Sequence, residues 1–134
     1  MVVEEWTCID DVIEYANAIH EVSVMIGSKK LTVHYMELEA NEMPSIKEMD
    51  LKVDKSKSED EQEAQITSKM MEQTSLAKIL KGESEYAKSH EGYRPITREK
   101  FYQLKESVRS QIAMSIYHID DAVMKDFLHG LKNQ

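Results

Sequence analysis

The stretch LTVHYMELEANEM, residues 31–43, decides the fold class of this chain. Its first five residues are rich in β-branched and aromatic side chains, which favour a strand. The eight residues that follow are mostly strong helix formers and run without a break to Pro44. We expect one helix over residues 29–42, capped by Ser28, with a short strand over 31–35 as the alternative.

The residues before this stretch predict a first helix over about 8–26. Apolar side chains recur at helical spacing, and Gly27 is a residue that readily ends a helix. Thr7 and Asp10 have the spacing of a capping pair at its start. Because the apolar face is wide, we expect this helix to be buried on most sides.

The residues after it predict a connector and two further helices. Residues 44–58 have little to bury and are expected to be mobile. Ser58 and Glu61 form a capping box for a helix over 59–81, which Gly82 would end, and residues 83–94 are expected to be a loop. Thr97 has the position of an N-cap for a long helix over about 97–131, whose apolar stripe steps at helical spacing from Phe101 to Leu131.

Together these elements predict an all-α fold. We expect one helical domain over residues 1–134, a small bundle of three to four main helices with a long C-terminal helix and a mobile acidic connector at 44–58. A chain of 134 residues is long enough for one core and too short for two.

Charge and composition narrow the class of protein. The formal net charge is −8, and residues 1–27 hold six acidic side chains and no lysine or arginine. This argues against a protein that holds nucleic acid over its whole surface. The sequence has no apolar run long enough to span a bilayer and a single cysteine, Cys8, so we expect a cytoplasmic protein.

The acidic N-terminal half predicts a binding protein. The sequence has no Gly-rich phosphate loop and no catalytic motif, and nothing in it calls for a cofactor. We therefore expect a non-enzymatic protein of the inhibitor, immunity or adaptor type that binds another protein, one with a basic surface. The candidate partner-binding residues are acidic side chains of the predicted first helix: Asp10, Asp11, Glu14 and Glu21.

Two alternatives use other residues. A helix face with three cations and one aromatic ring, suited to phosphate and base contacts, would make the chain a small DNA- or RNA-associated regulator; its residues are Arg98, Tyr102, Lys105 and Arg109. Two His-x-x-carboxylate pairs, each on one helix face, would make it a helical-bundle metalloenzyme; their residues are His34, Glu37, His118 and Asp121.

The C-terminal helix also predicts self-association. From Ile112 onward it carries a second apolar stripe, and one chain has too few helices to cover both. We expect a symmetric dimer whose seam includes Met114, Tyr117, Met124 and Leu128.

Overall fold

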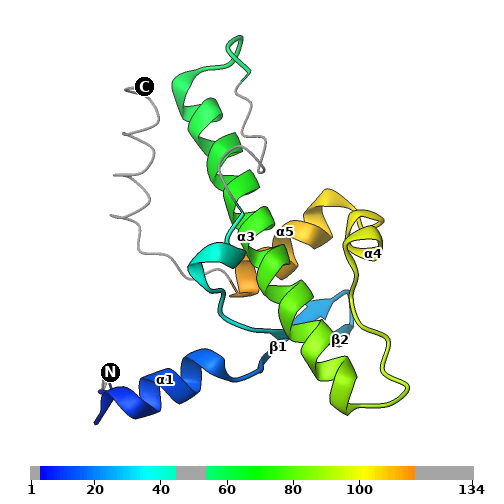
Figure 1. Ribbon diagram of the computed structural model, residues 1–134. Coiled ribbons are helices and arrows are strands. Elements are labelled where there is room, and N and C mark those ends of the chain that lie inside the picture. Colours follow the sequence, from blue (N-terminus) through cyan, green and yellow to red (C-terminus); the bar gives the residue numbers. More distant parts are fainter. Residues whose placement is uncertain (1–3, 45–53, 117–134) are drawn as a thin grey trace.

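The computed structural model describes residues 4–44 and 54–116, in which four α-helices accompany a two-stranded antiparallel sheet (Figure 1). The all-α prediction is therefore wrong. The elements in chain order are α1 (Ile9–Asn17), β1 (His20–Ile26), β2 (Lys29–Tyr35), the 3-10 turn η1 (Ala40–Glu42), α3 (Glu59–Ser89), α4 (Arg98–Tyr102) and α5 (Glu106–Ile116).

A β-hairpin replaces the end of the first predicted helix and the start of the second. Residues of β1 alternate, so that Val22, Val24 and Ile26 face the core while the residues between them are exposed. The two strands are joined at Gly27 and Ser28, and Gly27 has a φ of 63°, the left-handed conformation that a tight hairpin turn requires. The strand alternative for residues 31–35 is confirmed, and the helix over 29–42 is wrong.

The core lies where the hairpin meets α3, α4 and α5. Val33, Leu76 and Ile79 have no exposed surface, and Phe101, Ile112 and Ile116 pack into the same cluster. The long helix α3 crosses the hairpin, and α1 projects away from the rest of the described chain (Figure 1). None of the residues of α1 is buried, so the expectation that the first helix is covered on most sides is also wrong.

Helix α3 does not end at Gly82 but continues to Ser89. A Cβ atom built on Gly82 would lie 2.3 Å from the Cα atom of Tyr35, so only glycine lets helix and strand approach this closely. At the same crossing the Met36 amide donates to the Lys78 carbonyl at 3.1 Å. The glycine therefore marks a contact between backbones and not the end of a helix.

The predicted C-terminal helix begins where expected but is interrupted. The Thr97 hydroxyl accepts a hydrogen bond from the Lys100 amide, which confirms the N-cap, as the Ser58 hydroxyl does for Glu61 at the start of α3. Helix α4 then stops after Tyr102, and the chain turns before α5 begins at Glu106. The prediction of one continuous helix over 97–131 is therefore wrong in its first part. The end of that predicted helix lies outside the described residues. Most of the predicted connector 44–58 lies outside them as well. No helix of the described residues is long and apolar enough to cross a membrane.

Candidate protein-binding site

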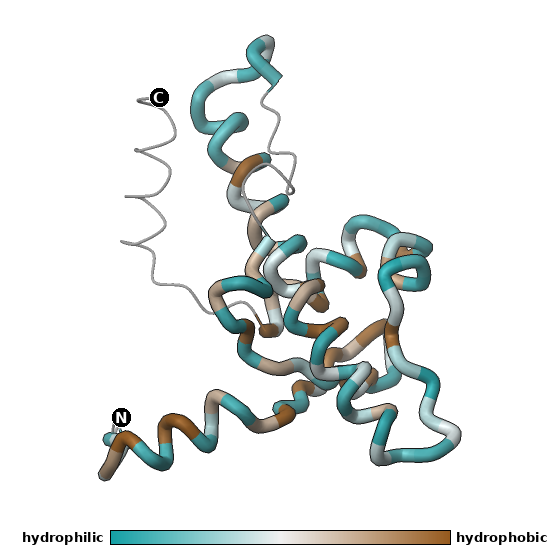
Figure 2. Tube along the Cα trace, in the orientation of Figure 1, coloured by the Kyte–Doolittle hydropathy of each residue, from teal (hydrophilic) through white to brown (hydrophobic). Residues whose placement is uncertain are grey.

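Helix α1 exposes an apolar face. Successive residues of a helix are about 100° apart, so Ile9, Ile13 and Ala16 share one side. Ile9 is 69 % exposed and Ile13 is 52 % exposed. Figure 2 shows these apolar segments on a helix that projects from the remaining described chain. A helix this short is not expected to be stable by itself, and packing of its apolar face would stabilise it.

Much of the remaining surface of α1 is acidic. Asp10, Asp11 and Glu14 are all exposed, and the first two lie in the first turn, where the positive end of the helix dipole favours carboxylates. Three of the four predicted partner-binding residues therefore share one face. The fourth, Glu21, is exposed but lies on β1, where its carboxylate is 3.4 Å from His34 Nε2.

A chain of aromatic rings connects α1 to the hairpin. Tyr15 lies 5.4 Å from Trp6 on one side and 4.3 Å from His20 on the other, measured between ring centroids. His20 in turn lies 5.3 Å from the buried Tyr35. Its Nε2 atom is buried and has no hydrogen-bond partner among the described residues. These contacts position α1 through the edge of its apolar face and leave Ile9 and Ile13 uncovered.

A buried carboxylate, Glu83, holds the hairpin against α3. It has no exposed surface and accepts hydrogen bonds from the His34 amide at 3.0 Å, the Tyr93 hydroxyl at 2.8 Å and the Ile96 amide at 2.8 Å. His34 Nδ1 also lies 2.7 Å from Glu83 Oε2. Charge-assisted bonds of this kind compensate the cost of burying a carboxylate. The cluster therefore joins strand, helix and loop.

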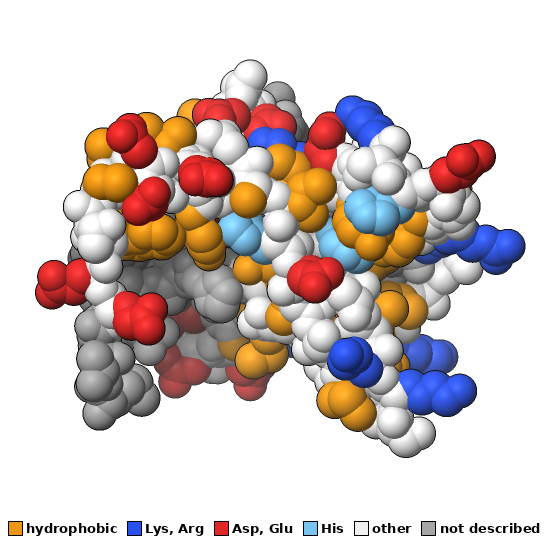
Figure 3. All heavy atoms as spheres, turned by 90° about the horizontal axis from the view of Figure 1, so that it is seen from below, with side chains coloured by type: hydrophobic (Ala, Val, Ile, Leu, Met, Phe, Trp, Pro, Cys, Tyr) orange, Lys and Arg blue, Asp and Glu red, His pale blue; other side chains and the backbone are white. Residues whose placement is uncertain are grey.

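The rings around this carboxylate are stacked. Tyr86 lies between His34 and His90 with centroid distances of 3.7 Å on each side, and the three rings are nearly parallel. The face of the molecule seen in Figure 3 shows histidine side chains surrounded by hydrophobic ones. Stacking favours the ring orientation in which His34 Nδ1 reaches Glu83 Oε2.

The predicted metal pair His34 and Glu37 is not brought together. His34 is bound to Glu83, whereas the Glu37 carboxylate pairs with Lys78 at 3.2 Å. Groups of three or more potential ligands do not occur within residues 4–44 and 54–116. The other predicted ligands, His118 and Asp121, lie outside the described residues.

Alkaline pH should destabilise the protein through Tyr93. Burial, followed by the hydrogen bond to Glu83, raises the pKa of Tyr93 above its ordinary value. The unfolded chain therefore loses the phenolic proton near pH 10 while the folded chain retains it, so stability falls as pH rises above about 10. We expect the free energy of unfolding, measured by urea titration between pH 8 and 11, to fall less steeply in Tyr93→Phe. Equal slopes for both proteins would contradict this assignment.

The four residues of the predicted nucleic-acid face lie in three different places. Tyr102 and Arg109 line a groove of about 500 Å³ between α3 and the start of α5, whereas Arg98 lines a separate pocket and Lys105 is exposed in the turn. Arg109 Nε donates to Glu72 at 2.8 Å, and its guanidinium lies 5.6 Å from the Tyr102 ring centroid.

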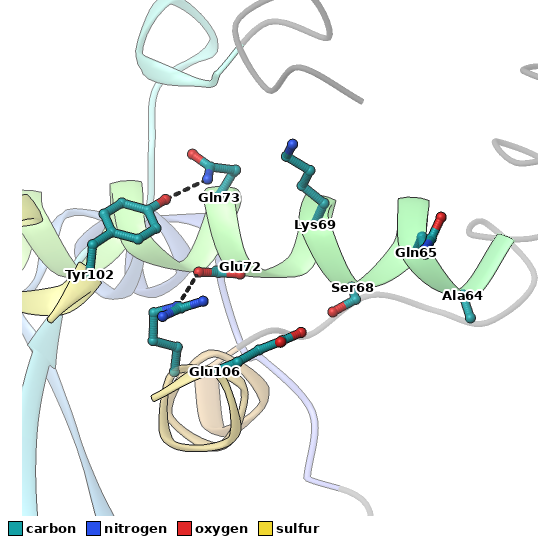
Figure 4. A pocket seen from close by; sticks show the side chains of 9 residues that line it. Ala64, Gln65, Ser68, Lys69, Glu72, Gln73, Tyr102 and Glu106 are labelled. Atoms are coloured by element: carbon teal, nitrogen blue, oxygen red, sulfur yellow. Dashed lines mark hydrogen bonds and ion pairs between the residues drawn. The ribbon is translucent and has the colours of Figure 1, made fainter. Parts of the chain in front are cut away.

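Side chains of both charges line that groove. Figure 4 shows Lys69 and Glu72 on α3 and Glu106 on α5, with Tyr102 bonded to Gln73. Two acidic and two basic side chains therefore line it, since Arg109 supplies the second cation. A groove without net positive charge lacks the main source of affinity for phosphates.

The predicted self-association seam is only partly described. Met114 is 65 % exposed on α5, and Tyr117, Met124 and Leu128 lie outside the described residues. The seam therefore stays a prediction.

Sequence reasoning missed two features of these sites. It assigned Ile9 and Ile13 to a buried face, although the alternation of residues 20–26 and the Gly27-Ser28 turn could have shortened the helix that precedes them. No local signal identifies Glu83 as buried. Comparison with protein families, curated proteins and solved structures gave no match for this chain.

Proposed function

We propose that this chain is a non-enzymatic binding protein, of the inhibitor, immunity or adaptor type, that uses α1 as its recognition helix. The observation that carries the proposal is the exposure of Ile9 and Ile13 on a helix of which no residue is buried. Burying a side chain of this size contributes about 1.5–3 kcal/mol, so a partner that covers both gains substantial affinity.

The chemistry of α1 specifies the surface that would receive it. An amphipathic helix binds through apolar anchors one turn apart in a hydrophobic groove. Asp10 and Glu14 each lie about 100° around the helix from an anchor, so they would border that groove, where lysine or arginine of the partner would complement them. We therefore propose a protein partner with an apolar groove bordered by basic residues.

Other surfaces fit α1 less well. Helices that lie in membrane interfaces carry lysine and arginine on their polar face, whereas that of α1 is acidic and would be repelled by anionic lipids. The acids of two α1 helices would likewise repel each other. The proposal places the protein in the cytoplasm, since Cys8 has no second cysteine with which to form an internal disulfide.

The test compares two variants that each remove exposed apolar surface. Ile9→Ser combined with Ile13→Ser should abolish binding because it removes both anchors, whereas Met43→Ser, at a residue 44 % exposed beyond the hairpin, should not. Proteins of a native lysate that are retained by both immobilised wild type and immobilised Met43→Ser are purified, and each is titrated against the wild type and the two variants by calorimetry.

The expected result is a Kd at least one hundredfold weaker for the double variant. Its circular dichroism spectrum and its Tm should match those of the wild type, which shows that the fold is retained. Binding of the wild type should also weaken with added salt, because the acidic edge of α1 contributes to association. A purified partner that binds the double variant as tightly as the wild type would contradict the proposal.

A further inference from the structure

Strand β1 has an outer edge, on the side away from β2, and the residues whose backbone groups point toward that edge can be identified. In an antiparallel pair, residues alternate between those that exchange hydrogen bonds with the opposite strand and those that point outward. His34 donates its amide outward to Glu83, so its partner across the hairpin, Glu21, also points outward. By alternation Ser23 and Met25 do the same, and the Met25 carbonyl indeed accepts from the Gln111 side chain.

Most of this edge has no partner in the described part of the chain. The amides and carbonyls of Glu21 and Ser23, and the amide of Met25, form no hydrogen bond with other described residues. The side chains of all three are exposed, and Val22 is only half-buried although Val33 opposite it has no exposed surface. An open edge of this kind is a template for another strand.

We propose that β1 pairs antiparallel with β1 of a second copy of this chain, about a two-fold axis at Ser23. The sheet then becomes four-stranded, with the two β1 strands in its centre. The two Ser23 residues exchange both their backbone hydrogen bonds, and the Met25 amide of each copy donates to the Glu21 carbonyl of the other. None of these bonds requires Gln111 to leave the Met25 carbonyl.

Charge disfavours the alternative register with its axis at Glu21. An axis at Glu21 would place two carboxylates directly opposite each other, which destabilises strand pairing, whereas an axis at Ser23 places Glu21 opposite Met25. The outer edge of β2 is less suitable, because Glu83 already occupies the His34 amide and Lys30 lies on the open part.

The same arrangement pairs the acidic helix with the basic turn. Lys29 and Lys30 are the only lysine or arginine residues among residues 1–46, and they begin β2 just after the turn. Within one chain α1 lies at the other end of β1 from this turn. Antiparallel pairing brings α1 of one copy to the turn of the other, so opposite charges face each other between copies. This inference does not rest on the proposed function.

Two proline variants test the edge. Ser23→Pro removes an outward amide and no bond within the hairpin, and Thr32→Pro does the same on the outer edge of β2. By sedimentation equilibrium we expect the wild type at high micromolar concentration to approach twice 15.5 kDa. Thr32→Pro should reach the same mass as the wild type. The Ser23→Pro dimer should be weaker and should dissociate into monomers already at a concentration at least ten times higher than the wild-type dimer does. A wild type that stays monomeric would overturn the proposal.

A cross-linking experiment keeps the test independent of how well the proline variants fold. In a Cys8→Ser background, Ser23→Cys should form a disulfide-linked dimer on mild oxidation, because Cα atoms of a hydrogen-bonded antiparallel pair are about 5.5 Å apart, within disulfide range. Thr32→Cys in the same background should remain monomeric on reducing-agent-free gels, and Met114→Glu should leave the dimer intact. Equal cross-linking of both cysteine variants, or loss of the dimer in Met114→Glu, would overturn the proposal.

Discussion

Gly82→Ala should be strongly destabilising even though alanine is a better helix former than glycine. The added Cβ would lie 2.3 Å from the Tyr35 Cα atom and 2.5 Å from its carbonyl carbon. Both contacts are with backbone atoms, so relief requires α3 to move away from the hairpin. Helix propensity would contribute about 1 kcal/mol in favour of alanine. We expect a net loss of about 3 kcal/mol and a Tm lower by roughly 10 °C, measured by circular dichroism.

Ser84→Ala is the matched control for this substitution. Ser84 is exposed on the same helix, so the change alters helix propensity without adding an atom at the crossing. We expect its effect on unfolding to lie within about 0.5 kcal/mol. A Gly82→Ala protein as stable as the wild type would show that helix and strand are not in backbone contact.

Glu83→Ala should lower the free energy of unfolding by as much as Gly82→Ala does, or by more. The substitution leaves the His34 amide, the Ile96 amide and the Tyr93 hydroxyl without their acceptor. Removing one member of a buried charged network typically costs about 3–5 kcal/mol, a large share of the 5–15 kcal/mol that ordinarily stabilises a domain. Urea unfolding followed by fluorescence measures the loss.

Glu85→Ala provides the comparison for Glu83→Ala. Glu85 lies in the same helix and pairs with Lys88 at 2.7 Å, but both side chains reach solvent. Exposed ion pairs contribute about 0–1 kcal/mol, so this variant should unfold close to the wild type. Similar losses for the two variants would mean that the buried hydrogen bonds of Glu83 contribute no more to stability than an exposed ion pair.

Local signals predicted the starts of helices better than their ends. Ser58 and Thr97 act through their own hydroxyl groups on amides within the next turn, so both caps were recognisable from a few residues. Gly82 was misread because two different physical causes favour glycine. It can end a helix in a left-handed conformation or admit a neighbouring backbone, and only the position of Tyr35 distinguishes them.

The hairpin shows why the apolar residues of a strand can fit the spacing of a helix. Residues at spacings of three and four occur along a helix face, but Val22, Val24 and Ile26 also fit the two-residue period of a strand. Packing of β2 against α3 favours the strand over the helix. That contact joins residues far apart in the sequence, such as His34 and Glu83, so local patterns do not reveal it. The break between α4 and α5 is similar, since no glycine or proline lies between Tyr102 and Glu106 to announce it.

The candidate site was predictable in its charge but not in its apolar part. Asp10, Asp11 and Glu14 lie on an exposed face because acidic side chains at helical spacing remain in water wherever the helix packs. Whether Ile9 and Ile13 are covered depends on how many elements the chain can place against them. In the described part of the chain α1 projects away from the other elements, and both side chains are exposed.

The Glu83 cluster also has a consequence for the order of folding. The hairpin can close through its two-residue turn and α3 can form by itself, both within microseconds, because their contacts are local. Joining them requires Glu83 to meet His34 across a sequence separation of 49 residues. The carboxylate gives up bound water at that step and gains the His34 amide as a donor. We expect the strand–helix junction to form after the hairpin and α3, and we expect α1, none of whose residues is buried, to open before that junction in hydrogen exchange.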